Sequence, residues 1–440
     1  MNKAKKIYVD FNEVIAQIKP MHAINNMPCL PYNRKNMYEC IKEANIPYSR
    51  LHDTGGAFGG SRYVDINNIF PDFDADETDA SSYDFAFTDV LLQEMVKYDV
   101  KPFYRLGTTI ENFQKIKAYN IYPPKDYHKW AKICEMIIRH YNEGWADGFY
   151  MGIEHWEIWN EPDNFPDDEN QMWKGTKEEY FELYKVASLH LKKRFPNLKI
   201  GGYASCGFYA INGTDVSSDA KTSNRFGYFV DFFIDFLEYV RENKLPFDFF
   251  SWHSYASVAD NIVYAEYARE KLDSYGFKDC EMYLNEWNYR IDERGTQKNA
   301  SDTLAMMCAL QNSSVDMCMY YQASIVSAYC GIFNPINYDV FNAYYAFYYF
   351  GKLYKMKHQV LCNAEGDNIY SIAAADEQNK GIIIVNNSSE AVSVDINICG
   401  NDDKKSIKIY ATDDRHRCDV LSVNGSLIDF PAYGIRYIEL

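Results

Sequence analysis

The first 354 residues alternate between two hydrophobic patterns. Short apolar runs bounded by polar or turn residues predict strands, and longer segments with apolar residues at three- and four-residue spacing predict helices. In the segment Lys177–Phe195, Phe181, Tyr184 and Leu191 recur along one side of a helix, and charged residues occupy the other side. The predicted strands are Ile18–Ile24, Ile46–Leu51, Val100–Leu106, His155–Trp159, Leu198–Tyr203, Phe247–Trp252, Glu281–Leu284 and Met317–Tyr321. The predicted helices are Asn33–Ala44, Asp89–Lys97, Asp126–Tyr141, Lys177–Phe195, Tyr228–Glu242, Ile262–Tyr275, Asn299–Ser313 and Tyr344–Tyr354.

Strands that alternate with helices in this way predict an α/β fold, a closed (β/α)₈ TIM barrel. The alternative is an open doubly wound sheet, which often carries a glycine-rich phosphate loop after its first strand. The glycine-rich stretch at residues 55–60 follows the second strand instead, and it lacks the lysine and the helix start that phosphate binding needs. The barrel is therefore favoured.

After Tyr354 the pattern changes to short alternating stretches separated by Asn, Asp, Gly and Ser turns, which is typical of an accessory C-terminal β-sandwich. We therefore expect a barrel over residues 14–356 and a sandwich over residues 357–440. The sandwich is short of strands, so we expect the N-terminal residues 1–13 to complete it through Lys6–Phe11. Its other predicted strands are Asn368–Ala373, Gly381–Asn386, Val392–Ile398, Ser406–Tyr410 and Ile435–Leu440.

Composition narrows the class of partner. The 440 residues are 47% hydrophobic, enough for a sizeable core, and they carry a net charge of −17. That charge repels nucleic acid phosphates and anionic membrane surfaces, so neither is an expected partner. No apolar run has the length of a signal peptide or a membrane span. The 11 cysteines include no Cys-x-x-Cys pair, which favours reduced thiols and a cytoplasmic protein.

The sequence predicts neither a metal nor a cofactor. The long segment 53–82 contains an acidic run, but its spacing does not match an EF-hand, and we interpret it as a solvated lid over the barrel mouth. The nine histidines form no His-Glu-x-x-His pair.

Two glutamates are the candidates for chemistry. Glu161 ends the fourth predicted strand and Glu286 ends the seventh, and these strands face each other across a barrel mouth. One glutamate at a strand end is most often solvated or salt-bridged. Here each glutamate follows an aromatic-rich strand and an asparagine, and each is flanked by tryptophan. Paired carboxylates are what glycoside hydrolysis requires, one protonated and one ionised.

In these segments the chain resembles glycoside hydrolase family 39, a group of retaining exo-glycosidases that includes β-xylosidases and α-L-iduronidases. The resemblance covers most of the chain. The asparagine–glutamate–proline motif is common to a larger clan of families. The histidine–aspartate after strand two together with Trp-His-x-Tyr after strand six narrows the resemblance to this family. The matching segments are Tyr48–Asp53, Tyr83–Asp89, Lys101–Phe103, Trp159–Pro162, Phe249–Tyr255 and Asn285–Trp287.

The resemblance implies a role for each matching residue. Glu161 would be the general acid/base, and Glu286 would be the nucleophile. We expect burial and the charge of Glu286 to raise the pKa of Glu161.

The resemblance also implies substrate contacts. Asn160 would hydrogen-bond the hydroxyl next to the anomeric carbon, and Tyr255 would orient Glu286. His52 and His253 would bind sugar hydroxyls, or would instead be structural residues satisfied by backbone. Trp287 would pack under the sugar or fill the wall.

The chain departs from the family pattern at two places. Arg105, after strand three, is either an ion-pair partner inside the barrel or a contact for an anionic or hydroxyl-rich sugar. Strand eight lacks the tryptophan that commonly forms the floor of the sugar site. These departures leave the identity of the sugar open.

The sequence therefore predicts a retaining exo-glycosidase that cleaves a terminal sugar from short oligosaccharides or glycosides, with β-xylosidase as one candidate. The alternatives are a carbohydrate-binding pseudo-enzyme and a transglycosylase. The accessory module could mediate a homo-oligomer, although the sequence gives no direct sign of one.

Overall fold

The computed structural model describes residues 4–28, 36–54, 63–110, 120–166, 168–212, 220–401, 407–422 and 425–440. Eight parallel strands in chain order close into a barrel, which confirms the predicted (β/α)₈ fold. Each predicted barrel strand overlaps an observed one. The barrel strands are β2 (Ala23–Asn25), β3 (Tyr48–Leu51), β4 (Lys101–Leu106), β5 (His155–Ile158), β6 (Lys199–Ser205), β7 (Phe249–Ser254), β8 (Glu281–Trp287) and β9 (Met317–Tyr320).

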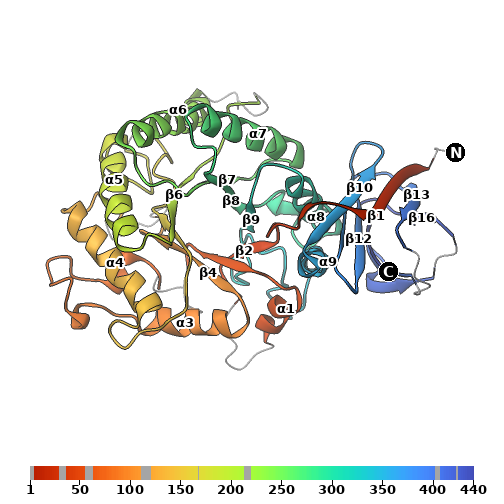
Figure 1. Cartoon of the computed structure of the whole chain (residues 1–440), viewed down its shortest axis with the longest axis horizontal. Helices are drawn as coiled ribbons and strands as arrows, with labels where there is room; N and C mark the ends of the chain where they lie inside the picture. The colour runs from red at the N-terminus through yellow and green to blue at the C-terminus, as the bar shows by residue number, and fades with distance from the viewer. Residues whose placement is uncertain are drawn as a thin grey trace.

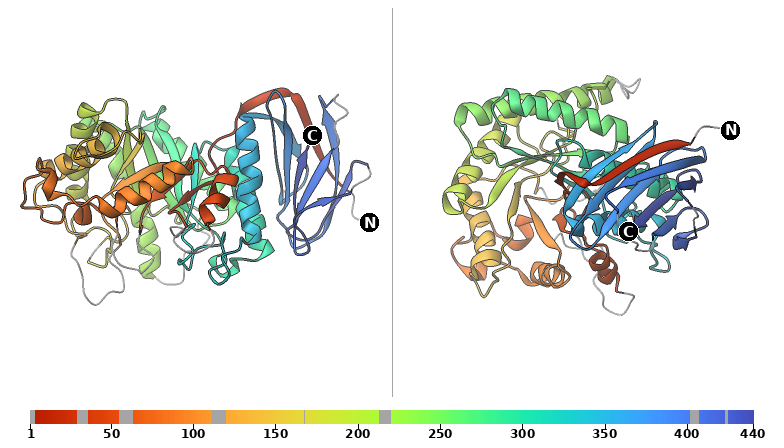
Figure 2. Two further views of the ribbon diagram at one scale, coloured as in Figure 1. Left: turned by 90° about the horizontal axis from the view of Figure 1, so that it is seen from below. Right: turned by 45° about the vertical axis from the view of Figure 1, so that its right-hand side comes forward.

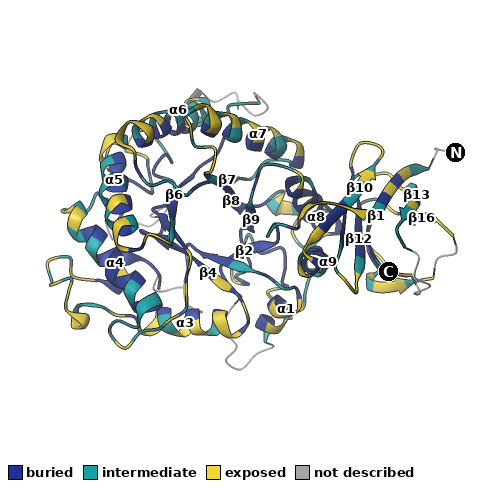
Figure 3. Cartoon of the chain, viewed as in Figure 1, coloured by how far each residue is buried: buried dark blue, intermediate teal, exposed yellow. Residues whose placement is uncertain are grey.

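Helices form a ring outside the barrel strands (Figure 1). Their exposed faces point outward and their buried faces pack on the strands, as the yellow and dark blue sides of the ring show (Figure 3). The main helices are α1 (Met37–Glu43), α3 (Ala86–Lys97), α4 (Tyr127–Glu143), α5 (Lys177–Arg194), α6 (Ala220–Asn243), α7 (Val258–Ser274), α8 (Gln297–Gln311) and α9 (Asn342–Met356). Among the residues that the structure describes, none of the helices is both long enough and apolar enough to span a bilayer.

The expected lid segment is described only in part. Residues 55–62, which include the glycine-rich stretch, lie outside the described residues, as do the first three residues of the predicted helix Asn33–Ala44. The remainder of the lid segment contains α2 (Ile66–Ile69) and the short 3₁₀ helix η1 (Ala80–Ser82), and a second 3₁₀ helix, η2 (Ile291–Glu293), follows β8.

A nine-stranded curled sheet forms the accessory module. Its order is β15-β14-β17-β12-β11-β10-β1-β13-β16, so the N-terminal strand β1 lies between β10, to which it runs antiparallel, and β13, to which it runs parallel. The sheet has its own apolar core, separate from that of the barrel. The division of the chain at residue 357 stays a prediction. The strands are β1 (Lys5–Gln17), β10 (His358–Ala364), β11 (Ile369–Ala375), β12 (Lys380–Asn386), β13 (Val392–Cys399), β14 (Lys408–Thr412), β15 (Arg417–Leu421), β16 (Leu427–Phe430) and β17 (Ile435–Glu439).

Helices α8 and α9 lie between the barrel and the curled sheet (Figure 2). The amide of Gln297, the first residue of α8, donates to the carbonyl oxygens of Thr412 and Tyr433 at 3.1 and 2.6 Å. The hydroxyl of Ser301 donates to the carbonyl oxygen of Asn386 at 3.2 Å. These hydrogen bonds hold the sheet against the side of the barrel.

The barrel interior has an apolar layer and a polar layer. Phe103, Phe249 and Tyr283 belong to a small buried cluster near the N-terminal ends of β4, β7 and β8. Two residues further along β8, Asn285 is fully buried, as is Glu157 on β5. Asn285 is nearer than Tyr283 to the C-terminal end of its strand. The polar layer therefore lies between the apolar cluster and the mouth of the barrel.

Candidate active site

Glu161 and Glu286 meet at the C-terminal mouth of the barrel. One carboxylate oxygen of each, together with one ring nitrogen of His253, all lie within 4.8 Å of one another. Glu161 stands in a tight turn after β5, with a left-handed backbone (φ 46°), and its amide donates to the carbonyl oxygen of Ala204 at 3.0 Å. Glu286 lies within β8. The two side chains are 16% and 8% exposed, so both carboxyls are largely removed from water but open to one side.

His253, from β7, bridges the two carboxylates. Its Nδ1 is hydrogen-bonded to Oε1 of Glu161 at 2.7 Å and lies 3.7 Å from Oε2 of Glu286. Among the residues that the structure describes, its other ring nitrogen, Nε2, is buried and has no hydrogen-bond partner.

Arg50, from β3, is the buried cation beneath the pair. Its guanidinium donates to Oε2 of Glu157 at 2.8 Å, to Oδ1 of Asn160 at 2.6 Å and to Oε2 of Glu286 at 3.3 Å. The other oxygen of Glu157 accepts from Ser251 at 2.7 Å and from Asn285 at 2.5 Å. This network neutralises charges that would otherwise be costly to bury, and it fixes the position of Glu286.

Two further expected site residues contact this network. The hydroxyl of Tyr255 donates to Oε1 of Glu286 at 2.7 Å. Asn160 directs its carbonyl oxygen to Arg50, and therefore its amide group is the part that remains for another partner.

The structure contradicts the expected pKa of Glu161. Burial raises this pKa, but the hydrogen bond and charge of His253 and the charge of Arg225 outweigh burial, so the pKa of Glu161 is lowered. Burial also raises the pKa of Glu286; the charge of His253 lowers it, the charge of Glu161 raises it, and the net shift is upward. Burial lowers the pKa of His253, but Glu286 and Glu161 raise it by more. The sequence indicated the two carboxyls but not that an imidazole separates them.

His52 lies at the same mouth, on the side of β9. Its Nε2 is 3.3 Å from Oδ1 of Asp53, and Oδ2 of Asp53 accepts from the hydroxyl of Tyr321 at 3.0 Å. Burial raises the pKa of Tyr321, and the charges of Asp53 and then Glu286 raise it further. Tyr321 follows β9, where the sequence lacks the usual tryptophan.

Trp287 and Arg105 are not brought to an open surface. Trp287 is 1% exposed, and its ring packs edge-on against Tyr320 with centroids 5.3 Å apart. Arg105 is fully buried, and its guanidinium donates to Asp65 at 2.6 Å. Asp65 also accepts from the amide of Thr109 at 2.8 Å. This geometry agrees with the ion-pair alternative for Arg105 and with the wall-filling alternative for Trp287.

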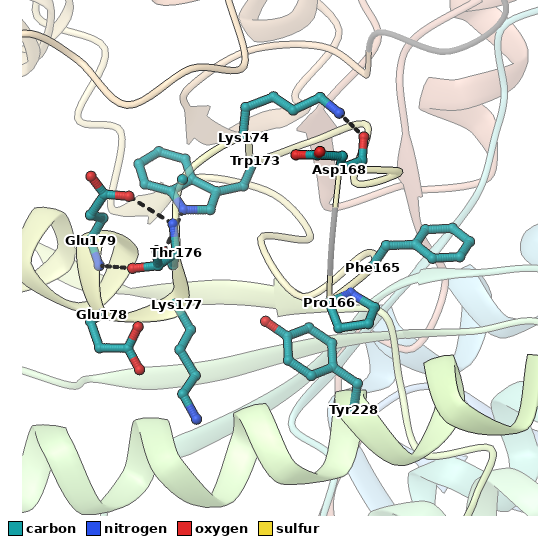
Figure 4. A pocket seen from close by; sticks show the side chains of 11 residues that line it. Phe165, Pro166, Asp168, Trp173, Lys174, Thr176, Lys177, Glu178, Glu179 and Tyr228 are labelled. Atoms are coloured by element: carbon teal, nitrogen blue, oxygen red, sulfur yellow. Dashed lines mark hydrogen bonds between the residues drawn. The ribbon is translucent and has the colours of Figure 1, made fainter. Parts of the chain in front are cut away.

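A cavity of about 430 Å³ opens beside the segment that follows Glu161 (Figure 4). Phe165 and Pro166 line one side, and Tyr228 of α6 lies near them. At the other side the segment enters α5 through a capping box, in which the backbone amides and side chains of Thr176 and Glu179 are reciprocally hydrogen-bonded at 2.7 and 3.2 Å. The capping box fixes the end of the segment that begins at the acid/base candidate.

Within the described parts of the chain, Glu161, His253 and Glu286 are the one group whose carboxylates and imidazoles cluster closely enough to hold a metal ion. Their oxygens already accept hydrogen bonds from Tyr255, Arg50 and His253. The donor set therefore fits a hydrogen-bonded carboxylate pair.

Sequence reasoning assigned no role to Arg50 or Glu157. Each is a charged residue in a largely buried strand, and each occupies an inward position of the barrel. A charged residue at an inward strand position needs a partner across the barrel, and that signal would have indicated both.

A parallel barrel with two close carboxyls at its mouth is the arrangement of glycoside hydrolases with paired glutamates. The chain belongs to glycosyl hydrolases family 39, whose family model matches residues 59–289, more than half of the 440 residues.

Known relatives include two beta-xylosidases. The one from Geobacillus stearothermophilus is 29% identical over 234 residues, which are 49% of this chain and 40% of that protein. The one from Caldicellulosiruptor saccharolyticus is 28% identical over 231 residues, 50% of this chain and 39% of that protein. The matched part of the chain thus spans about two fifths of the length of each relative.

Solved structures share the whole fold. A glucosidase from Croceicoccus marinus superposes with a TM-score of 0.76 at 19% identity and covers 100% of this chain and 99% of its own. A monomeric beta-xylosidase from Caulobacter crescentus gives a TM-score of 0.67 at 15% identity and covers 99% of both chains. At these identities the likeness concerns the fold.

Proposed function

We propose that the protein is a retaining exo-glycosidase, with Glu161 as general acid/base and Glu286 as nucleophile. The observation that carries the proposal is the approach of the two carboxylates to within 4.8 Å. Retaining enzymes hold their carboxyls about 5 Å apart, whereas inverting enzymes need roughly 6.5–9.5 Å to admit a water molecule. The separation in this chain therefore supports the retaining class.

In the first step, an oxygen of Glu286 attacks the anomeric carbon, the glycosidic C–O bond breaks, and the leaving oxygen takes a proton from Glu161. In the second step, a water molecule gives a proton to Glu161 and its oxygen displaces Glu286 from the anomeric carbon. Arg50 and Tyr255 favour the ionised form of Glu286 and orient it for the attack, because both donate to its oxygens.

His253 supplies the proton that Glu161 needs. The raised pKa of His253 and the lowered pKa of Glu161 favour the proton on the imidazole, 2.7 Å from Oε1 of Glu161. A bound sugar excludes water from Glu161, and this desolvation raises the pKa of the carboxyl. The proton then moves along the existing hydrogen bond to Glu161, which passes it to the leaving oxygen.

The sugar lies between this pair and the polar groups on the β9 side. We assign its hydroxyls to the amide of Asn160, to His52 and to His253, whose buried, unpartnered Nε2 supports a donor role. The substrate is a short oligosaccharide or glycoside. The beta-xylosidase relatives favour a xyloside over other sugars.

A reducing compartment such as the cytoplasm suits the chain, because the cysteines that the structure describes form no disulfide with one another.

Incubation with activated 2-fluoro glycosides, followed by peptide mass spectrometry, tests the proposal. A panel of xylose, arabinose, galactose, glucose, fucose and uronic acid derivatives should give one sugar that labels Glu286 covalently. A chain that labels at no residue and turns over no aryl glycoside would be a binding pseudo-enzyme. Sugar transfer to an added alcohol in preference to water would identify a transglycosylase.

A further inference from the structure

The proposed acid/base has a second set of contacts, which come from outside the barrel. Oε1 of Glu161 is bonded to His253, and Oε2 accepts a hydrogen bond from Nδ2 of Asn164 at 3.0 Å. Asn164 is 5% exposed and stands three residues after Glu161 in the same turn. Its backbone amide donates to the carbonyl oxygen of Glu161 at 3.1 Å, which holds the turn closed.

Arg225, from α6, holds this turn in place. Its Nε donates to the carbonyl oxygen of Asn164 at 2.7 Å. Its guanidinium stacks over the ring of Phe165 at 4.2 Å and lies 5.3 Å from the ring centroid of Phe229. A guanidinium held by a hydrogen bond and an aromatic face has little freedom, so its charge stays at a fixed place beside the turn that carries Glu161.

Resting on the proposed function, we infer that Asn164 and Arg225 are positioning residues that stabilise the ionised form of Glu161 and so favour its role as base in the second step. An amide N–H group can donate to a carboxylate oxygen but cannot accept from a carboxylic acid proton. The hydrogen bond from Asn164 therefore favours the carboxylate, and the nearby positive charge of Arg225 acts in the same direction.

The direction of the pKa of Glu161 agrees with this geometry. Burial and His253 have the largest effects on this pKa. The charge of Arg225 and the hydrogen bond from Asn164 come next, and both lower the pKa. The other charged or titratable groups that face Glu161 are His253, Glu286, Arg50, Asp163, Cys206, Tyr209, Tyr255 and Tyr329. Most of these line the barrel mouth, whereas Arg225 reaches Glu161 from the outer ring of helices.

The test compares pH profiles of Asn164→Ala, Arg225→Gln and Arg225→Lys on the aryl glycoside that the wild type hydrolyses best. Loss of the hydrogen bond or the charge raises the pKa of Glu161, so the alkaline limb of kcat/KM, which follows the proton that His253 and Glu161 share, should move to higher pH, by about half a unit to one unit. Arg225→Lys keeps the charge and should shift the limb less than Arg225→Gln. Arg241→Gln, on the same helix but paired with Glu238, is the matched control and should leave the limb in place.

The two steps of the proposed reaction distinguish a positioning role from a merely structural one. With an activated leaving group, hydrolysis of the glycosyl-enzyme limits kcat, so on the acid side of the profile, where the raised pKa leaves less of Glu161 ionised, the variants should lose up to about tenfold in kcat and less in kcat/KM. An alkaline limb that does not move upward in any of these variants, or equal losses in kcat and kcat/KM, overturns the inference. If Asn164→Ala does not fold, the two Arg225 variants decide it, because that side chain is half-buried. If the inference fails but Glu161 still behaves as acid/base, the proposed function stands. If Glu161→Ala keeps full activity on every substrate, the proposed function itself fails.

Discussion

One carboxylate oxygen of Glu161 lies within 4.8 Å of one of Glu286, although 125 positions separate the two residues in the chain. The barrel produces this proximity, because β5 and β8 both end at the same mouth. Between the two carboxyls stands His253, which touches Glu161 and approaches Glu286. Three groups with coupled charges therefore share the chemistry that the sequence assigned to two.

Replacement of Glu161 by alanine should depend on the leaving group. Substrates with poor leaving groups need the proton, so we expect a loss of about 10³–10⁴ in kcat/KM for them, and less than about 10² for activated aryl glycosides. Steady-state kinetics on a series of aryl glycosides checks this. Glu154→Ala, an exposed glutamate paired with Lys101, is the control. Equal losses across the series would remove Glu161 from the role of acid.

Replacement of His253 by glutamine should move both limbs of the pH profile. The charge of His253 lowers the pKa of Glu286 and, with its hydrogen bond, that of Glu161. Without the imidazolium both pKa values rise. The acid limb, set by the ionisation of Glu286, should shift upward by about one pH unit, and the alkaline limb should move because it no longer follows the proton on His253.

The control for this change is His190→Gln on α5, where the histidine pairs with Glu135 away from the mouth. Its profile of kcat/KM against pH should match that of the wild type. A His253→Gln variant whose limbs stay fixed would show that the proton does not rest on His253.

Replacement of Arg105 by methionine separates the two interpretations of this residue. As a buried partner of Asp65, Arg105 leaves an uncompensated carboxylate behind when it is lost, which costs about 3–5 kcal/mol of unfolding free energy. Urea denaturation should show this loss, while KM for aryl glycosides stays within twofold. A stable variant with a tenfold higher KM would instead make Arg105 a sugar contact.

Much of the fold followed from the sequence because local periodicity encodes it. The eight barrel strands and the apolar face of α5 repeat at their characteristic spacings, and parallel strands bring Glu161 and Glu286 to one end. Strand β10 was missed because its sequence, His358–Ala364, shows no clean alternation of buried and exposed residues.

The electrostatics of the site did not follow from the sequence. The contact between His253 and Glu161 joins residues 92 positions apart, and the ion pair between Arg50 and Glu157 spans 107. Neither has a local signature, because each depends on side-chain directions inside the closed barrel. The shift in the pKa of Glu161 changes direction through one such contact, so only the folded arrangement predicts that direction.

The anomeric configuration of the first sugar released tests the central claim most directly. Proton NMR of a fresh reaction with an aryl glycoside, recorded before the product mutarotates, reports this configuration. Two displacements through Glu286 predict a product with the same anomeric configuration as the substrate. A first product of inverted configuration would mean that water attacks the sugar directly, and would contradict the account.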